Sequence, residues 1–343
     1  MDSQVIARAS GRSSGRRSAP SSEKPWIAVT IWLFGTVGGN PVKRLEEAGF
    51  RVRRNTRFRT LTNTETSAMA RDAVGIIAGV EHWSDEMLAA CPRLKVISRI
   101  GVGLDNIDLD AARRRGIAVT TTPRGSTQAV AEVTLGMILS LSRRLPVYSE
   151  AMSRGTWKAV PNGMLTGKTL GIVGLGRIGR RLVDLAKPFG LRVLASEPEP
   201  DLSFVHQRGV TLVSLESLLR ASDIVSLHLS YSPSVRHLMN QKRFGLMKRG
   251  ALFINTSRGA VVDETALLAA VRSKRVAGAG LDVFETEPYR GMLCRMPNVI
   301  TTPHVASFTQ ESWRDMEEQA IDNLLAALCP ARSRMAAAGK GAP

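Results

Sequence analysis

Residues 167–179 read Gly-Lys-Thr-Leu-Gly-Ile-Val-Gly-Leu-Gly-Arg-Ile-Gly, a short apolar run followed by three glycines in the pattern G-x-G-x-x-G. The run predicts a buried strand at residues 169–173, and the glycines predict a tight turn into a helix. In such a turn Gly174 permits the bend, Gly176 lets a pyrophosphate approach the backbone, and Gly179 allows the helix to pack on the strand. We therefore expect a dinucleotide here; a tight turn without a ligand is the alternative.

Two further features indicate which dinucleotide the turn would hold. The amides of Arg177 and Ile178 open the helix and would point at the phosphates, where the helix dipole also favours anions. Glu197 ends the next predicted strand, 23 residues after Gly174. A carboxylate there accepts hydrogen bonds from a ribose 2′-hydroxyl and repels a 2′-phosphate. We therefore predict NAD rather than NADP, with a solvated acidic loop containing Glu197 and Glu199 as the alternative.

Strand-like and helix-like segments alternate on both sides of the glycine turn. Alternation with unbroken apolar strands is typical of parallel sheets covered by helices on both faces. We predict an α/β fold of two Rossmann-like domains: a flavodoxin-like substrate domain from residues 26–121 and 305–330, and an NAD-binding domain from residues 122–304. The first domain is discontinuous, because the last helix returns to it after the nucleotide-binding half is complete.

The alternation predicts the individual elements. The expected strands are at residues 27–33, 50–53, 73–78, 94–100, 117–121, 169–173, 192–195, 224–229, 251–255, 277–283 and 298–301. The expected helices are at residues 41–48, 109–115, 129–143, 177–189 and 310–328, with others starting near Ser84, Ser214, Gln241 and Asp263. We expect residues 146–166 to form a loop, residues 1–25 a disordered basic tail and residues 331–343 a flexible tail.

The composition narrows the class of protein. The 343 residues carry 47 Lys and Arg against 30 Asp and Glu, a net charge of +17, and three cysteines without metal-ligand spacing. The charge fits nucleic-acid binding, attraction of small anions, or a genome-wide preference for arginine. No nucleic-acid-binding module is recognisable, so we expect no such partner. Because no apolar run approaches the roughly 20 residues that span a bilayer, we expect a soluble, cytoplasmic protein without a bound metal.

Three polar side chains follow apolar stretches in the last third of the chain: Arg258, Glu287 and His304. A guanidinium binds a carboxylate through two parallel hydrogen bonds, and an imidazole titrates near neutral pH. A carboxylate beside the imidazole orients it and stabilises its charged form. Together with a dinucleotide, these groups indicate hydride transfer to or from a 2-hydroxy or 2-keto acid. Two other histidines, His206 and His237, are expected at the surface.

Six motifs stand in order along the chain. They are Gly-Val-Gly-Leu-Asp-Asn-Ile-Asp at residues 101–108, Ala-Val-Ala-Glu at 129–132, the glycine turn at 167–179, Asn-Thr-Ser-Arg-Gly at 255–259, Leu-Asp-Val-Phe-Glu-Thr-Glu-Pro at 281–288 and Thr-Pro-His at 302–304. By these motifs, residues 65–328 resemble the D-isomer-specific 2-hydroxyacid dehydrogenases, in the branch similar to D-3-phosphoglycerate dehydrogenase.

The resemblance implies roles for the residues at matching positions. Arg258 would bind the substrate carboxylate, His304 would be the acid/base, and Glu287 would orient the imidazole. Asp282 would contact the nicotinamide end of the cofactor. Further cofactor contacts would fall on His228, Leu229, Thr256 and Ser257, and further substrate contacts on Gly79, Val102 and Gly103.

The resemblance also implies partners. The substrate would be a small anionic D-2-hydroxy or 2-keto acid, with 3-phosphoglycerate as one candidate. Ala78 and Gly79 stand where phosphoglycerate-specific members usually place an Arg-Ser pair, so a side chain expected to help hold an anionic substrate is missing and the identity of the acid stays open. Residues 143–166 resemble an arm used for dimerisation, so we expect a homodimer, with Trp157 and Met164 as anchors or as core residues. A non-enzymatic NAD(H)-sensing protein, similar to a corepressor on the same fold, is the alternative function.

Overall fold

The computed structural model describes residues 23–329, so the tails predicted at residues 1–25 and 331–343 lie outside the described residues apart from residues 23–25. The chain divides into two compact units, which we describe separately. Unit 1 comprises residues 23–126 and 309–329 of the described chain, and unit 2 comprises residues 127–308. Within the described chain, no helix is both long and apolar enough to cross a membrane.

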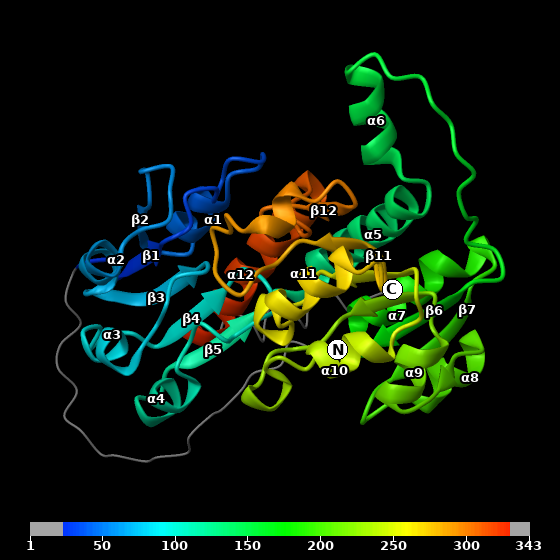
Figure 1. Cartoon of the computed structure of the whole chain (residues 1–343). Helices are drawn as coiled ribbons and strands as arrows, with labels where there is room; N and C mark the ends of the chain where they lie inside the picture. Colours follow the sequence, from blue (N-terminus) through cyan, green and yellow to red (C-terminus); the bar gives the residue numbers. More distant parts are fainter. Residues whose placement is uncertain (1–22, 330–343) are drawn as a thin grey trace, which may run out of the picture. The chain divides into compact units, whose positions relative to one another are not determined.

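Unit 1 is built on a five-stranded parallel sheet in the order β2-β1-β3-β4-β5 (Figure 1). Its strands are β1 (Trp26–Val29), β2 (Arg51–Arg54), β3 (Ala73–Ala78), β4 (Val96–Arg99) and β5 (Ala118–Thr121). Its helices are α1 (Pro41–Glu47), α2 (Asn63–Ala70), α3 (Asp85–Ala89), α4 (Leu109–Arg114) and α12 (Gln310–Leu328). Apolar side chains of α1 and α12 cover one face of the sheet, and those of α2, α3 and α4 cover the other.

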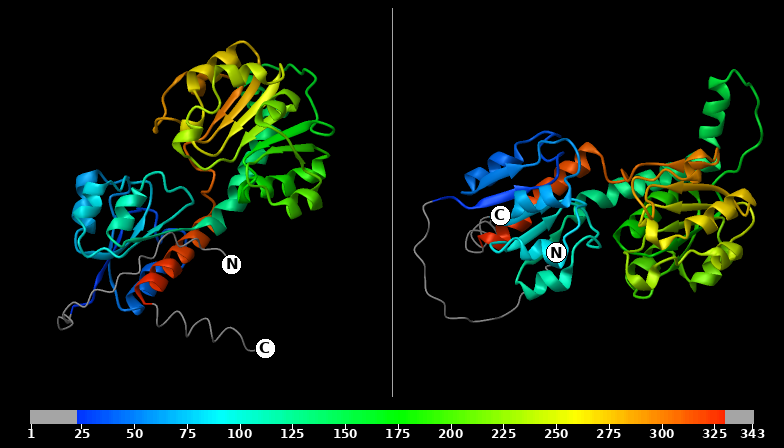
Figure 2. Two further views of the ribbon diagram at one scale, coloured as in Figure 1. Left: turned by 90° about the horizontal axis from the view of Figure 1, so that it is seen from below. Right: turned by 60° about the vertical axis from the view of Figure 1, so that its left-hand side comes forward.

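Unit 2 is built on a seven-stranded parallel sheet in the order β12-β11-β10-β9-β6-β7-β8. Figure 2 shows these strands between two groups of helices. The strands are β6 (Thr169–Val173), β7 (Arg192–Ser196), β8 (Thr211–Leu212), β9 (Ile224–Leu227), β10 (Ala251–Asn255), β11 (Val276–Leu281) and β12 (Val299–Thr301). The α-helices are α5 (Pro123–Ser142), which enters from unit 1, α6 (Leu145–Ser153), α7 (Arg177–Ala186), α8 (Leu202–Arg208), α9 (Leu215–Ala221), α10 (Gln241–Leu246) and α11 (Glu264–Arg272). Short 3-10 helices are η1 (Lys187–Phe189), η2 (Pro233–Val235), η3 (Gly259–Val261) and η4 (Met292–Arg295).

The strand order of unit 2 fixes where a ligand can approach its sheet. β6 lies between β7 and β9, so the chain leaves the carboxyl ends of β6 and β9 in opposite directions. Such a reversal opens a crevice at the carboxyl edge of a parallel sheet. All residues of β6 and β9 are buried, which explains their continuous apolar character, since both faces of these strands carry helices.

The predicted α/β fold with two parallel sheets is confirmed, and the predicted strands at residues 169–173 and 251–255 coincide with β6 and β10. The loop predicted at residues 146–166 is wrong in its first part, because α6 occupies it. Pro146 lies in the first turn of α6, where a missing N–H costs no hydrogen bond. None of the α6 residues is buried, so no core-facing periodicity marked the helix.

Besides α6, two helices were not predicted, although each has a recognisable start. α2 begins with a capping box between Thr62 and Glu65, and α8 begins after Asp201, whose side chain accepts from the amides of Ser203 and Phe204. Such caps satisfy the amides that a helix start leaves without partners. The apolar patterning of these short helices is weak. Their capping residues therefore indicated the helix starts better than the apolar pattern did.

Phe253 provides a test of the core of unit 2. Its side chain is 0% exposed, and its ring meets that of Phe244 edge to face with 5.1 Å between centroids. We expect Phe253→Ala to lower the free energy of unfolding by about 3–5 kcal/mol, because it removes buried area and leaves a cavity. Phe58, which is 75% exposed, is the control, and Phe58→Ala should cost less than about 0.5 kcal/mol. Urea unfolding followed by circular dichroism measures both; equal losses would contradict this packing.

Candidate active site

The glycine turn after β6 leaves one side of the backbone open. Gly174 has φ of 93°, and a β-carbon there would lie 2.7 Å from the carbonyl oxygen of His228. A β-carbon at Gly179 would lie 2.4 Å from the carbonyl oxygen of Gly174, so α7 packs directly against the turn. At Gly176, by contrast, an added β-carbon would meet nothing within 4 Å. The turn thus leaves space where a pyrophosphate would approach the backbone.

The start of α7 faces the same open space. Gly176 is its N-cap and supplies no side-chain acceptor for the first amides of the helix. These amides, including those of Arg177 and Ile178, therefore suit an anionic ligand. The residues around the turn fit a dinucleotide phosphate.

Glu197 follows β7 at the carboxyl edge of the sheet, beside the glycine turn. Its Oε2 accepts a hydrogen bond from the Leu175 amide at 2.7 Å, and its Oε1 accepts one from the Glu199 amide at 3.2 Å. The first bond ties the carboxylate to the turn itself, while Glu199 is exposed. The geometry therefore favours Glu197 over Glu199 as the acid near a ribose.

The turn that carries Arg258 is shaped by a buried amide at the end of β10. Oδ1 of Asn255 accepts from the Ser257 amide at 3.0 Å and from the Ser257 hydroxyl at 2.7 Å. Its Nδ2 donates to the carbonyl oxygen of Arg258 at 3.0 Å. Because buried polar groups need hydrogen-bond partners, these bonds hold the turn in one conformation.

Gly259 brings the Arg258 turn against the turn after β11. A β-carbon at Gly259 would lie 1.8 Å from the carbonyl carbon of Phe284, which no side chain can tolerate. Glycine is therefore required for this approach. Phe284 lies in the turn that also carries Glu287, so the two turns touch directly.

Glu287 and His304 form a hydrogen-bonded pair at this junction. Nδ1 of His304 lies 2.8 Å from Oε2 of Glu287, and Oε1 accepts from the Phe284 amide at 3.0 Å. Burial opposes ionisation of Glu287, but the bond from His304, the charge of that imidazole, the Phe284 amide and the charge of Arg258 together hold its pKa below its usual value. An ionised carboxylate only accepts, so Nδ1 donates and Nε2 remains for another partner.

Asp282 fastens the turn that presents His304. The Asp282 carboxylate is 1% exposed and accepts from the Thr302 hydroxyl at 2.6 Å, the Val305 amide at 2.8 Å and the Ala306 amide at 2.9 Å. The His304 amide donates to the Asp282 carbonyl at 2.9 Å, and His304 adopts φ of 55°. The resemblance implied a contact with the nicotinamide; in the structure both carboxylate oxygens bind the turn.

The remaining predicted cofactor residues lie at the ends of neighbouring strands. Burial lowers the pKa of His228 to about 4, and its Nε2 lies 2.9 Å from the Ser226 hydroxyl, so its imidazole is neutral at physiological pH. Thr256 and Ser257 are buried, and the Thr256 hydroxyl bonds that of Thr134 at 3.0 Å. The side chain of Leu229 would lie 3.1 Å from a β-carbon at Gly174.

The predicted substrate residues other than Arg258 belong to unit 1. The Gly79 amide donates to Oε2 of buried Glu81 at 2.8 Å, and Nδ2 of Asn106 donates to the Gly79 carbonyl at 3.2 Å and the Glu81 carbonyl at 2.7 Å. Val102 is exposed in the loop that follows β4, next to Gly103. Sequence reasoning missed Asn106, which shapes the Gly79 loop.

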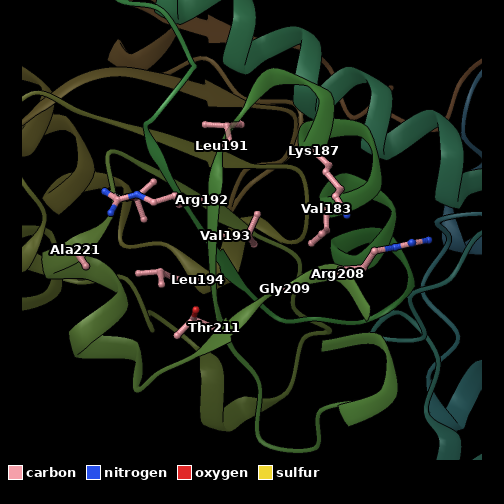
Figure 3. Close-up of a pocket in the computed structure, with 11 residues that line it drawn as sticks. Val183, Lys187, Leu191, Arg192, Val193, Leu194, Arg208, Gly209, Thr211 and Ala221 are labelled. Carbon is pink, nitrogen blue, oxygen red and sulfur yellow. Dashed lines mark hydrogen bonds between the residues drawn. The ribbon is translucent and has the colours of Figure 1, made fainter. Parts of the chain in front are cut away.

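A cavity of about 510 Å³ in unit 2 lies away from these groups. Its lining includes Thr169, Arg192 and Thr211, the first residues of β6, β7 and β8. In Figure 3 Arg192 lies on one side of β7, and Lys187 and Val183 lie on the other. Since the strands are parallel, this cavity is at the amino edge, opposite the glycine turn. Among residues 23–329, no group of three or more His, Cys, Asp and Glu side chains is placed to hold a metal.

Comparison with known proteins agrees with this geometry. The family model "D-isomer specific 2-hydroxyacid dehydrogenase, NAD binding domain" matches residues 135–306. The chain is 41% identical over 255 residues to a glyoxylate reductase of Thermococcus litoralis, covering 70% of this chain and 76% of that protein. It is 37% identical over 290 residues to a D-3-phosphoglycerate dehydrogenase of Methanocaldococcus jannaschii, covering 83% of this chain and 54% of that longer protein. A crystal structure of D-lactate dehydrogenase from Aquifex aeolicus, complexed with NAD and lactic acid, matches with a TM-score of 0.78 and 30% identity over 91% of this chain and 98% of that chain.

Fold, glycine turn and histidine–carboxylate pair together define a dinucleotide-dependent oxidoreductase. The chain belongs to the D-isomer specific 2-hydroxyacid dehydrogenase family. It is an NAD-dependent enzyme acting on the CH–OH group of 2-hydroxy acids, and the predicted family and cofactor are confirmed. The enzymatic function is thereby favoured over the NAD(H)-sensing alternative.

The hydrogen bonds of Asp282 lead to a test of its role. In Asp282→Asn, an amide N–H₂ would face a backbone donor of the His304 turn, so the turn would shift. We expect kcat to fall about 10- to 100-fold, the effect of a misplaced catalytic group, while NADH affinity changes little. Steady-state kinetics and NADH fluorescence titration measure the two effects. A loss of NADH affinity as large as the loss of kcat would instead support direct contact with the nicotinamide.

Proposed function

We propose that the chain transfers a hydride between NAD and a small anionic D-2-hydroxy or 2-keto acid, with Arg258, Glu287 and His304 as its catalytic residues. The observation that carries this proposal is the 2.8 Å bond between His304 and Glu287. It lies at a junction of turns that also includes Arg258. An imidazole that is hydrogen-bonded to an ionised carboxylate can accept the proton of an alcohol. A guanidinium beside it can bind the carboxylate of the same substrate.

Each residue has one task in the proposed reaction. The guanidinium of Arg258 binds the substrate carboxylate and so orients the neighbouring carbon. NAD, when bound, supplies the acceptor for the hydride that leaves that carbon. Nε2 of His304 takes the hydroxyl proton, and the ionised Glu287 stabilises the resulting imidazolium. In the reverse direction the same imidazolium returns the proton to the carbonyl oxygen.

We propose a substrate with a short, uncharged side chain, such as glyoxylate or hydroxypyruvate. Ala78 and Gly79 supply no cation, and a β-carbon at Gly79 would lie 2.9 Å from Cγ1 of Ile31. The absence of a cationic side chain at these two positions is what disfavours the doubly charged phosphate of 3-phosphoglycerate. The similarity to a glyoxylate reductase supports this choice.

A homodimer through residues 143–166 remains our prediction, as does a cytoplasmic location. In Figure 1, α6 and the segment after it project from the body of unit 2. Trp157 is 88% exposed and Met164 is 72% exposed, so neither is a core residue of its own chain. Such apolar exposure on a projecting segment is typical of a surface that a partner covers.

The first test of the function is an assay with NADH and a panel of 2-keto acids: glyoxylate, hydroxypyruvate, pyruvate and 3-phosphohydroxypyruvate. We expect loss of NADH absorbance with at least one of the first two. His304→Ala should lower kcat by at least about 100-fold and leave NADH binding intact, because it removes the acid/base group alone. Retained turnover in His304→Ala would exclude the histidine from this role.

Glu197 provides a separate test of cofactor choice. Glu197→Ala, which removes the carboxylate, should weaken NADH binding by about 1.5–3 kcal/mol, the value of a hydrogen bond to a charged group, and leave NADPH binding unchanged or stronger. Glu199→Ala is the matched control, because Glu199 is exposed and lies two residues away. An unchanged preference between NADH and NADPH in Glu197→Ala would refute the assignment.

A further inference from the structure

A histidine outside the proposed catalytic trio lies between β9 and α10. His237 follows η2 and adopts φ of 48°, in the left-handed region that residues other than glycine seldom occupy. Backbone of this kind persists only where the surrounding contacts determine it, and it is concentrated at functional sites. The contacts of His237 therefore bear on its role.

The backbone of this segment is fastened to the Arg258 turn. The His237 amide donates to the carbonyl oxygen of Ala260 at 2.9 Å, and the Met239 amide donates to that of Val261 at 3.0 Å. Ala260 and Val261 belong to η3, which begins directly after Arg258. Two backbone hydrogen bonds thus tie the segment to the turn that carries the guanidinium.

The imidazole of the same residue reaches the other turn. Its Nε2 lies 2.9 Å from Oε1 of Glu285, and the guanidinium of Arg236 pairs with this carboxylate as well. The Glu285 amide donates to Oε1 of Glu264, at the start of α11, at 2.7 Å. Glu285 lies two residues before Glu287. Three groups from two neighbouring segments therefore hold the turn that presents the Glu287 carboxylate.

We propose that His237 is a positioning residue for the reaction. It joins the Arg258 turn, through its backbone, to the Glu287 turn, through its imidazole. The two turns already touch at Gly259 and Phe284. The hydrogen bond between His237 and Glu285 connects them at a second point. This inference rests on the proposed roles of Arg258, Glu287 and His304. Residues that support a catalytic group matter because small displacements of that group cost rate.

The test compares three variants: His237→Ala, His237→Gln and His206→Ala. His206 is an exposed histidine on α8 and is the matched control. We expect His237→Ala to lower kcat about 10- to 100-fold with little change in the KM for NADH, because a positioned group is displaced while the cofactor site stays intact. The amide of glutamine reaches about as far as Nε2, so His237→Gln should restore most of kcat. The control should behave as the unaltered enzyme.

A second readout does not depend on turnover. The ring signals of His304 in NMR spectra, assigned by their absence in His304→Ala, should move in His237→Ala and stay in place in His206→Ala. If the unaltered chain reduces no keto acid, the proposed function fails, and the ring signals alone then decide the inference. Unmoved signals, an unchanged kcat, or a loss of kcat that glutamine does not restore would each overturn it. Should His237→Ala not fold, Glu285→Gln tests the bond between His237 and Glu285 from the other side. Unchanged kcat and unmoved His304 ring signals in Glu285→Gln would also overturn the inference.

Discussion

The close contact between Gly259 and Phe284 is the constraint on which the candidate site depends. An added β-carbon would lie 1.8 Å from the Phe284 carbonyl carbon, so the backbones of two turns touch with no side chain between them. These turns follow β10 and β11, which are adjacent and parallel, and parallel strands bring their carboxyl ends to one edge of the sheet. The parallel strands only bring the two segments to the same edge of the sheet. The backbone contact between Gly259 and Phe284 then defines where Arg258 and Glu287 lie relative to each other.

Buried polar side chains then hold each turn in a single conformation. Asn255 bonds the turn of Arg258, and Asp282 bonds the turn of His304 through both carboxylate oxygens. Neither group is accessible to solvent, so each must find its partners inside the protein or destabilise the fold. Because Asn255 and Asp282 must form hydrogen bonds inside the protein, they fix the turns that carry Arg258 and His304 and so orient these two side chains. His304 at positive φ is tolerated because these bonds determine its backbone.

Patterns with a local physical cause could be predicted from the sequence. The apolar run at residues 169–173 became β6, and the three glycines after it occupy positions where bending, open access and close packing are required. α6 was wrongly expected to be a loop, because its apolar side chains face solvent and carry no core signal. α8 was not predicted, because a short helix with one buried residue shows little periodicity, although Asp201 caps it.

By itself, the sequence determined the class of fold, the glycine turn, and the chemical types needed at residues 258, 287 and 304, since these depend on local spacing and on intrinsic side-chain chemistry. Only the tertiary structure decided how those side chains are held. The commitment of Asp282 to the His304 turn, and the link from His237 to Glu285, join residues that are far apart in the chain. Such bonds depend on how neighbouring strands place their turns, and no local pattern in the sequence encodes that placement.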